Sequence, residues 1–166
     1  MLVLLCALAT TGSAVGFAAG TDETTVMEAL VLIGQGHQAD AARMLEPVAA
    51  GGSASAQYQL GLLLARGEGV TQDFARAADW FARAAEQDHS HAQFILGHMY
   101  ARGEGLARDP VQAYVWFSAA TANGWWKARE ARERLVAAGM SAQQVALAGK
   151  RYRDWRAGRD AAGDEH

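Results

Sequence analysis

The chain has 166 residues, a formal net charge of -3 and a hydrophobic share of 51%. This length suits one domain or a short repeat array, and the hydrophobic share excludes a disordered chain. The mild acidity argues against a protein that coats nucleic acid. Alanine fills 37 positions and proline only two. Because alanine is the strongest helix former, we expect an all-α protein.

The first 20 residues carry no charged side chain. The apolar run from Leu2 to Ala9 and the small residues Ala18-Ala19-Gly20 predict a signal peptide over residues 1–20. An uncleaved membrane anchor is the alternative, because 20 uncharged residues could just span a bilayer. Cys6, the only cysteine, lies in this segment, so the mature chain is expected to have no disulfide. We therefore expect a periplasmic or secreted bacterial protein, or one held at the inner membrane by a retained leader.

Residues 22–55 predict a helix pair that forms a degenerate N-terminal repeat or cap. The two helical segments run from Asp22 to Gly34 and from Gln38 to Ala50. Gly51-Gly52 follows the second segment, and glycine commonly ends helices because it adopts the left-handed conformation.

A period of 36 residues relates residues 56–91 to residues 92–127, with 14 identical positions. Each period predicts two helices, separated by a repeated Arg-Gly-Glu-Gly segment that ends the first helix. Asp73 and Asp109 stand where the second helix of each pair needs an N-cap. Because one such pair cannot bury its apolar faces alone, we expect the pairs to stack.

These landmarks resemble those of the Sel1-like repeat, a relative of the tetratricopeptide repeat. The first copy meets the pattern at Ala56, Tyr58, Leu60, Gly61, Gly67, Gly69, Val70, Asp73, Ala77, Trp80, Ala84 and Ala85. The second copy meets it at Ala92, Phe94, Leu96, Gly97, Tyr100, Gly103, Gly105, Leu106, Asp109, Ala113, Trp116 and Ala120. The resemblance implies a right-handed α/α superhelix (solenoid), tetratricopeptide-like, whose concave helix-A surface binds proteins or peptides.

The pattern of residues 128–158 predicts a C-terminal capping helix pair. Ser141 is expected to cap the last helix, which runs to about Ala157. Residues 159–166 are expected to form an acidic tail. Residues 21–126 carry six basic and twelve acidic side chains, whereas residues 127–159 carry nine and three. The basic residues of the last helix form a candidate surface for anionic lipid: Lys150, Arg151, Arg153 and Arg156. A solvated basic face on a capping helix explains the same pattern.

No pattern of residues indicates an enzyme. The Gly-x-Gly loops follow helices rather than strands, so they predict interhelix turns and not phosphate sites. His89, His91 and His98 cluster in sequence without the spacing of a known metal site, and we interpret them as solvated. We expect no catalytic residue, no metal and no cofactor. An envelope hydrolase is the least favoured alternative, because the sequence offers no recognisable nucleophile.

The predicted function is that of a non-catalytic adaptor of the cell envelope, monomeric, with an unidentified protein or peptide partner and no nucleic acid. The candidate contacts on the first helices are Gln57, Gln59, Leu63, Gln93, His98 and Met99. Trp125 and Trp126 stand where the other repeats carry short or polar residues. Either both indoles pack under the final helix, or one of them anchors the partner, as tryptophan often does.

Overall fold

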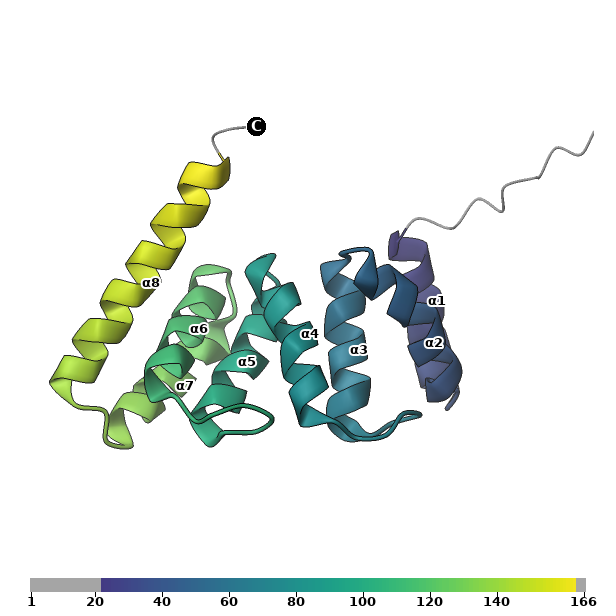
Figure 1. The fold of residues 1–166 in the computed structure, drawn as a ribbon, viewed down its shortest axis with the longest axis horizontal. Coiled ribbons are helices and arrows are strands. Elements are labelled where there is room, and N and C mark those ends of the chain that lie inside the picture. Colours follow the sequence, from purple (N-terminus) through teal and green to yellow (C-terminus); the bar gives the residue numbers. More distant parts are fainter. Residues whose placement is uncertain (1–21, 164–166) are drawn as a thin grey trace, which may run out of the picture.

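The protein is described by a computed structural model over residues 22–163, in which eight α-helices and no strands occur. The helices are α1 (Asp22–Gly34), α2 (Gln38–Ala50), α3 (Ala54–Arg66), α4 (Phe74–Glu86), α5 (Ser90–Arg102), α6 (Pro110–Ala122), α7 (Trp126–Ala137) and α8 (Ala142–Gly163). They follow one another along the long axis as a stack of antiparallel helices (Figure 1). Within this range, none of the helices has the length and apolarity needed to cross a membrane. The predicted signal peptide lies outside the described residues.

Local residues set the helix boundaries where the sequence predicts them. Asp73 accepts a hydrogen bond from the Arg76 amide at 3.0 Å, and Asp109 accepts one from the Val111 amide at 2.8 Å. Each carboxylate satisfies an amide that the first turn of a helix leaves without an intrahelical partner. The first helix of each repeat ends at Gly67 or Gly103, with φ of 68° and 74°. The predicted Asp N-caps are therefore confirmed.

Glycine lets the two helices of a repeat approach closely. A Cβ on Gly61 would lie 2.8 Å from Cε1 of Phe81, and one on Gly97 would lie 2.6 Å from Cδ1 of Phe117. Both phenylalanines are fully buried, with at most 1% of their surface exposed. The missing Cβ therefore makes room for the ring that fills the centre of each helix pair.

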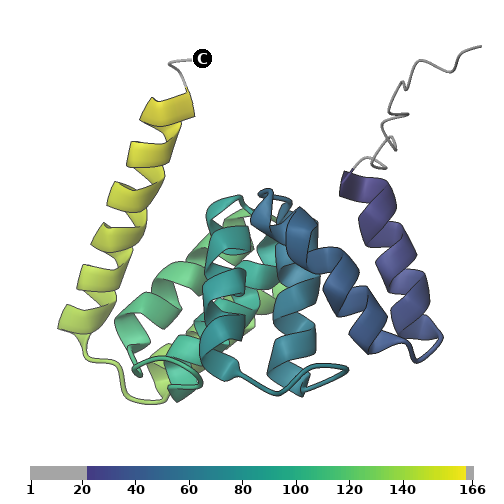
Figure 2. The same cartoon turned by 45° about the vertical axis from the view of Figure 1, so that its right-hand side comes forward.

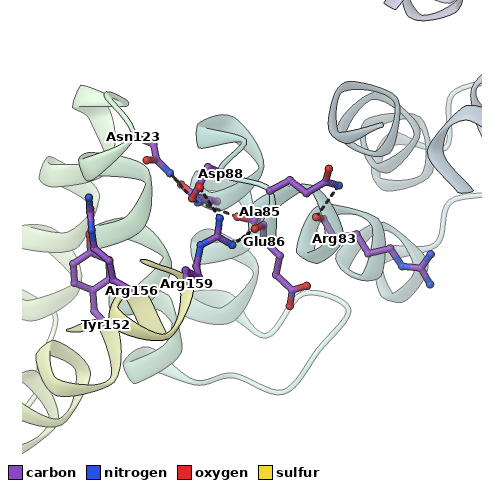
Figure 3. Close-up of polar contacts among 10 residues, drawn as sticks. Arg83, Ala85, Glu86, Asp88, Asn123, Tyr152, Arg156 and Arg159 are labelled. Carbon is purple, nitrogen blue, oxygen red and sulfur yellow. Dashed lines mark hydrogen bonds and ion pairs between the residues drawn. The ribbon is translucent and has the colours of Figure 1, made fainter. Parts of the chain in front are cut away.

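Two buried glutamines join successive helix pairs. The Nε2 groups of Gln57 and Gln93 donate to the carbonyls of Ala49 and Ala85, at 3.0 and 2.9 Å. Their Oε1 atoms accept hydrogen bonds from side-chain amides one repeat apart, Gln87 at 2.8 Å and Asn123 at 3.0 Å. Asn123 and Ala85 are seen at this junction in Figure 3.

The prediction that Gln57 and Gln93 contact a partner is wrong. Only 3% and 0% of their surfaces are exposed, because both amides are used inside the stack. Their identity across the 36-residue period was the sequence signal for a structural role, since a stacking contact recurs in each repeat.

The last helix leaves the regular pattern and packs along α6 rather than pairing with α7. Glu133 stands in α7 at the position of Gly61 and Gly97, so the close approach seen in the other pairs is not possible there. Trp155 of α8 instead meets Trp116 of α6 edge to face, with ring centroids 5.6 Å apart. In Figures 1 and 2, α8 accordingly stands at the edge of the stack.

The end of α8 is tied back to the turn between α4 and α5. The Arg159 guanidinium donates to the Asp88 carboxylate at 2.5 Å and also to the Glu86 carbonyl (Figure 3). The helix continues to Gly163, past the Ala157 at which the sequence predicts its end. Residues 159–163 are thus helical, and Arg159 is a part of α8 that contacts the rest of the array rather than part of a tail.

Candidate binding surface on the helix-A face

The helix-A face is the surface formed by the first helix of each pair: α1, α3, α5 and α7. It carries two hollows. The α5–α7 hollow has a volume of about 320 Å³, and the α1–α3 hollow one of about 250 Å³. Hollows of this size take one or two side chains of a partner rather than a folded element, so the face suits recognition of a peptide segment.

The α5–α7 hollow has apolar walls and a charged rim. Phe94 and His98 follow one another at a spacing of four on α5 and therefore point the same way. Phe117 closes the floor from α6, and α7 contributes Trp126 and Leu135. The rim consists of Lys127, Glu130 and Arg134.

A strip of stacked and tilted rings connects the two hollows. Tyr58 stacks on His89 at 4.6 Å between centroids, and His91 lies 3.9 Å from Trp125. Trp125 in turn lies 5.9 Å from Phe94, which lines the α5–α7 hollow. This aromatic strip gives the helix-A face a continuous, rigid and largely apolar floor.

Trp125 occupies an N-cap position at which the other repeats have a hydrogen-bond acceptor. In the two preceding repeats the side chains of Ser53 and His89 accept a hydrogen bond from a first-turn amide of α3 and α5. Trp125 gives α7 no such bond, and its own buried Nε1 has no hydrogen-bond partner among the described residues. Loss of an N-cap hydrogen bond lowers helix stability by about 0.5–2 kcal/mol, so Trp125 at this position makes the start of α7 less stable.

Trp126, next in sequence, is 69% exposed at the lip of the α5–α7 hollow. The alternative in which both indoles pack under the final helix is therefore wrong, because α8 covers α6 instead. Trp125 packs on α5, and Trp126 is left facing solvent.

The other candidate contacts divide between the surface and the interior. Gln59 lines the α1–α3 hollow and His98 lines the α5–α7 hollow. Leu63 and Met99 are only 2% and 3% exposed, inside the core. Their predicted role as partner contacts is wrong, since a partner on the surface cannot reach them. Sequence reasoning missed Lys127, whose place beside two tryptophans was the available signal.

Burial and neighbouring charge favour the neutral form of two histidines of this face, His89 and His98. Burial lowers the pKa of His98, and the nearby Arg102 and Arg134 lower it further against the opposing effect of Glu104. Burial likewise lowers the pKa of His89, with His91 as a second cause. Both imidazoles are therefore uncharged at neutral pH and contribute to the apolar character of the face.

The candidate basic surface on α8 is exposed but largely engaged within the protein. Lys150 pairs with Asp154 at 2.7 Å, and Arg151 lies 4.0 Å from Asp109. Arg156 donates to the Tyr152 hydroxyl at 3.2 Å. Arg153 is the member of this set with neither an ion pair nor a side-chain hydrogen bond among the described residues. In the same part of the chain, no three His, Cys, Asp or Glu side chains gather as metal ligands.

Stacked antiparallel helix pairs with a hollowed first-helix face place the protein among the α/α-superhelical repeat proteins. Residues 54–89 and 90–125 each match the Sel1 repeat, and each match begins at the start of a first helix. Residues 54–125 are thus two Sel1 repeats, two residues ahead of the boundaries predicted from the 36-residue period. The predicted Sel1-like repeats are confirmed over residues 54–125, and so is the all-α solenoid of stacked helix pairs.

Solved structures with the same fold include three bacterial proteins. A protective antigen of uropathogenic Escherichia coli with an SLR fold is 31% identical, has a TM-score of 0.77, and aligns over 82% of this chain and 30% of its own. A Sel1 repeat protein of Oxalobacter formigenes is 25% identical, has a TM-score of 0.64, and aligns over 68% of this chain and 48% of its own. Cysteine rich protein B of Helicobacter pylori shares the fold at 20% identity, with a TM-score of 0.59, and aligns over 65% of this chain and 89% of its own.

This chain therefore spans about a third of the length of the Escherichia coli antigen and about half that of the Oxalobacter protein. Comparison with the sequences of curated proteins gave no match.

Proposed function

We propose that this protein is a non-catalytic interaction module that binds a peptide segment of a partner protein on the helix-A face. Sel1 repeats are generally protein–protein interaction modules and typically lack catalytic activity. The observation that carries the proposal here is Trp126, whose indole is 69% exposed beside an apolar hollow. Binding hot spots are enriched in tryptophan, and exposed apolar surface of this kind commonly marks an interaction site.

The surroundings of Trp126 support this role. The aromatic strip behind it is held by the packing of α5, so the face is ordered before a partner arrives and less conformational entropy is lost on binding. Trp125 leaves α7 without a side-chain cap, and locally unfavourable residues of this kind cluster at binding sites. As part of the same proposal, the protein acts as a monomeric adaptor in the bacterial envelope, a location that rests on the apolar leader sequence.

The test is selection of random twelve-residue peptides displayed on phage against the purified protein, followed by binding measurements on the enriched peptides. Trp126→Ala is expected to weaken binding by at least about tenfold. Trp80→Ala is the matched control, because Trp80 is a part-exposed tryptophan of α4 that stacks under Arg83 and lines neither hollow. Circular dichroism verifies that both variants are folded. Absence of any enriched peptide, or equal binding by the Trp126 variant, would overturn the proposal.

A further inference from the structure

The two hollows of the helix-A face differ in charge. The α1–α3 hollow has one formally charged lining residue, Glu23. The α5–α7 hollow has Lys127 and Arg134 against Glu130, a net positive rim. A carboxylate on a bound peptide is therefore repelled by the first hollow and attracted by the second.

Lys127 is the cation on this rim that is left for a partner. Arg134 pairs with Glu130, four residues earlier on α7. Lys127 has no ion pair among the described residues, and its ammonium lies 5.9 Å from the Trp125 ring centroid and 5.5 Å from that of Trp126. These cation–π contacts hold the charge at the edge of the hollow without neutralising it.

The apolar walls lie next to this charge. Phe94, Phe117 and Leu135 line the hollow together with Trp126, and His98 beside them is uncharged at neutral pH. A peptide that inserts a large apolar side chain here places the neighbouring part of its backbone at the rim. A carboxylate close in sequence to that side chain can then accept a charge-assisted hydrogen bond from the Lys127 ammonium.

We propose, resting on the proposed function above, that the α5–α7 hollow binds an extended peptide in which a large apolar side chain stands within about two residues of a carboxylate. Lys127 selects the carboxylate, and Trp126 with the apolar walls selects the side chain. The carboxylate comes from an aspartate or glutamate or from the C-terminus of the partner chain, and the two sources are distinguished by experiment.

Four fluorescein-labelled ten-residue Gly/Ser peptides test this by fluorescence anisotropy. Two carry an internal Phe-Asp or Phe-Asn with an amidated end, and two end in phenylalanine as the free acid or the amide. At least one carboxylated peptide is expected to bind about tenfold more tightly than its neutral match, since an ion pair at a partly desolvated rim is worth about that factor. Whether the internal or the terminal carboxylate gives the preference identifies the source.

Charge reversal then tests the assignment of Lys127. Lys127→Glu is expected to abolish the preference and to favour a Phe-Lys peptide over Phe-Asp. Arg153→Glu, the same change of charge at an exposed site on α8, is expected to keep the wild-type preference. An unchanged preference in the Lys127 variant overturns the assignment.

The display-selected peptides separate failure of this inference from failure of the proposed function. If they bind through Trp126 while carboxylated and neutral probes bind equally, or not at all, the inference is wrong and the interaction module stands. If no peptide binds in either experiment, the proposed function fails with it. Lys127-dependent binding to phosphatidylglycerol vesicles, without binding to the carboxylated peptides, would overturn the inference in favour of a membrane surface.

Discussion

Gln57 and Gln59 of α3 stand two residues apart and have opposite roles. Successive residues of an α-helix turn by about 100°, so side chains two apart point to different sides of the helix. Gln57 points into the junction with α2 and bonds the Ala49 carbonyl, whereas Gln59 lines the α1–α3 hollow. At the residue scale, the register of the helix decides between a stacking bond and a binding surface.

Replacing a stacking glutamine is therefore expected to cost stability. Gln93→Leu removes the hydrogen bonds that the buried Gln93 side chain makes with the Ala85 carbonyl and the Asn123 amide. At about 0.5–1.5 kcal/mol for each bond, this is expected to lower the free energy of unfolding by about 1–3 kcal/mol. Gln59→Leu, the same change on the helix-A face, is expected to alter it by less than about 0.5 kcal/mol. Urea unfolding monitored by circular dichroism measures both. Equal midpoints for the two variants would contradict the stacking role.

The neutral histidines predict a pH dependence of stability. Their folded-state pKa values are lowered, so between neutral pH and about pH 5.5 the unfolded chain, with a histidine pKa near 6.5, binds more protons than the folded one. The free energy of unfolding should fall as the pH falls through this range. His98→Gln should reduce the difference between urea midpoints at pH 7.5 and pH 5.5. An undiminished difference would show that His98 does not contribute.

At the scale of the element, one position decides how two helices pair. Gly61 and Gly97 admit a phenylalanine ring from the second helix of their own repeat, whereas α7 has Glu133 at that position. The pairs α3–α4 and α5–α6 are consequently close, whereas α8 packs along α6 instead of pairing with α7. Within α7, Ala128 is the one buried residue, as expected of a helix covered mainly on one side.

A methyl group at this position tests the pairing. Gly97→Ala places a Cβ 2.6 Å from the Phe117 ring, and the overpacking is expected to cost about 1–3 kcal/mol despite the better helix propensity of alanine. Gly34→Ala is the control, because nothing lies within 4 Å of a Cβ there. It should leave stability unchanged or raise it by up to about 1 kcal/mol. Thermal unfolding distinguishes the two, and a stabilised Gly97 variant would refute the proposed fit.

Over the whole molecule, stability is transmitted from each helix to its neighbours. Each helix pair contacts the pairs on either side, and α8 closes the stack by covering the apolar surface of α6 around Trp116. In such an array the ends can open while the centre stays folded. The tie between Arg159 and Asp88 connects the end of α8 to the turn before α5.

Weakening the α8 contact should therefore open α8 alone. Trp155→Ala removes the ring packed on Trp116, and exchange of the α8 backbone amides should become at least about tenfold faster. Amides of α1 to α4 should keep their protection. Leu147→Ala, at a residue of α8 that is 44% exposed, serves as the control. Hydrogen exchange followed by mass spectrometry measures both, and faster exchange throughout the chain would show that α8 unfolds only with the whole array.

Much of the fold could be predicted from the sequence because its determinants are local. The Asp73 and Asp109 caps and the glycines that end the first helices act within a few residues of where they stand, and the 36-residue period shows where they recur. The candidate site was predicted less completely. Gln59, His98 and Trp126 line the two hollows, but Gln57 and Met99 are buried, and a one-dimensional pattern does not show which neighbour covers a side chain.

The sequence by itself determined a stack of helix pairs, the position of its two clear repeats to within two residues, and two adjacent tryptophans with no regular place in the repeat. The tertiary structure alone decided that α8 packs on α6, that Trp126 stays exposed and that Lys127 stands at the rim of an apolar hollow. The physical reason is the distance along the chain over which each interaction acts. Capping and helix propensity act between residues near in sequence, whereas burial, hollows and the charge around them depend on helices brought together by folding.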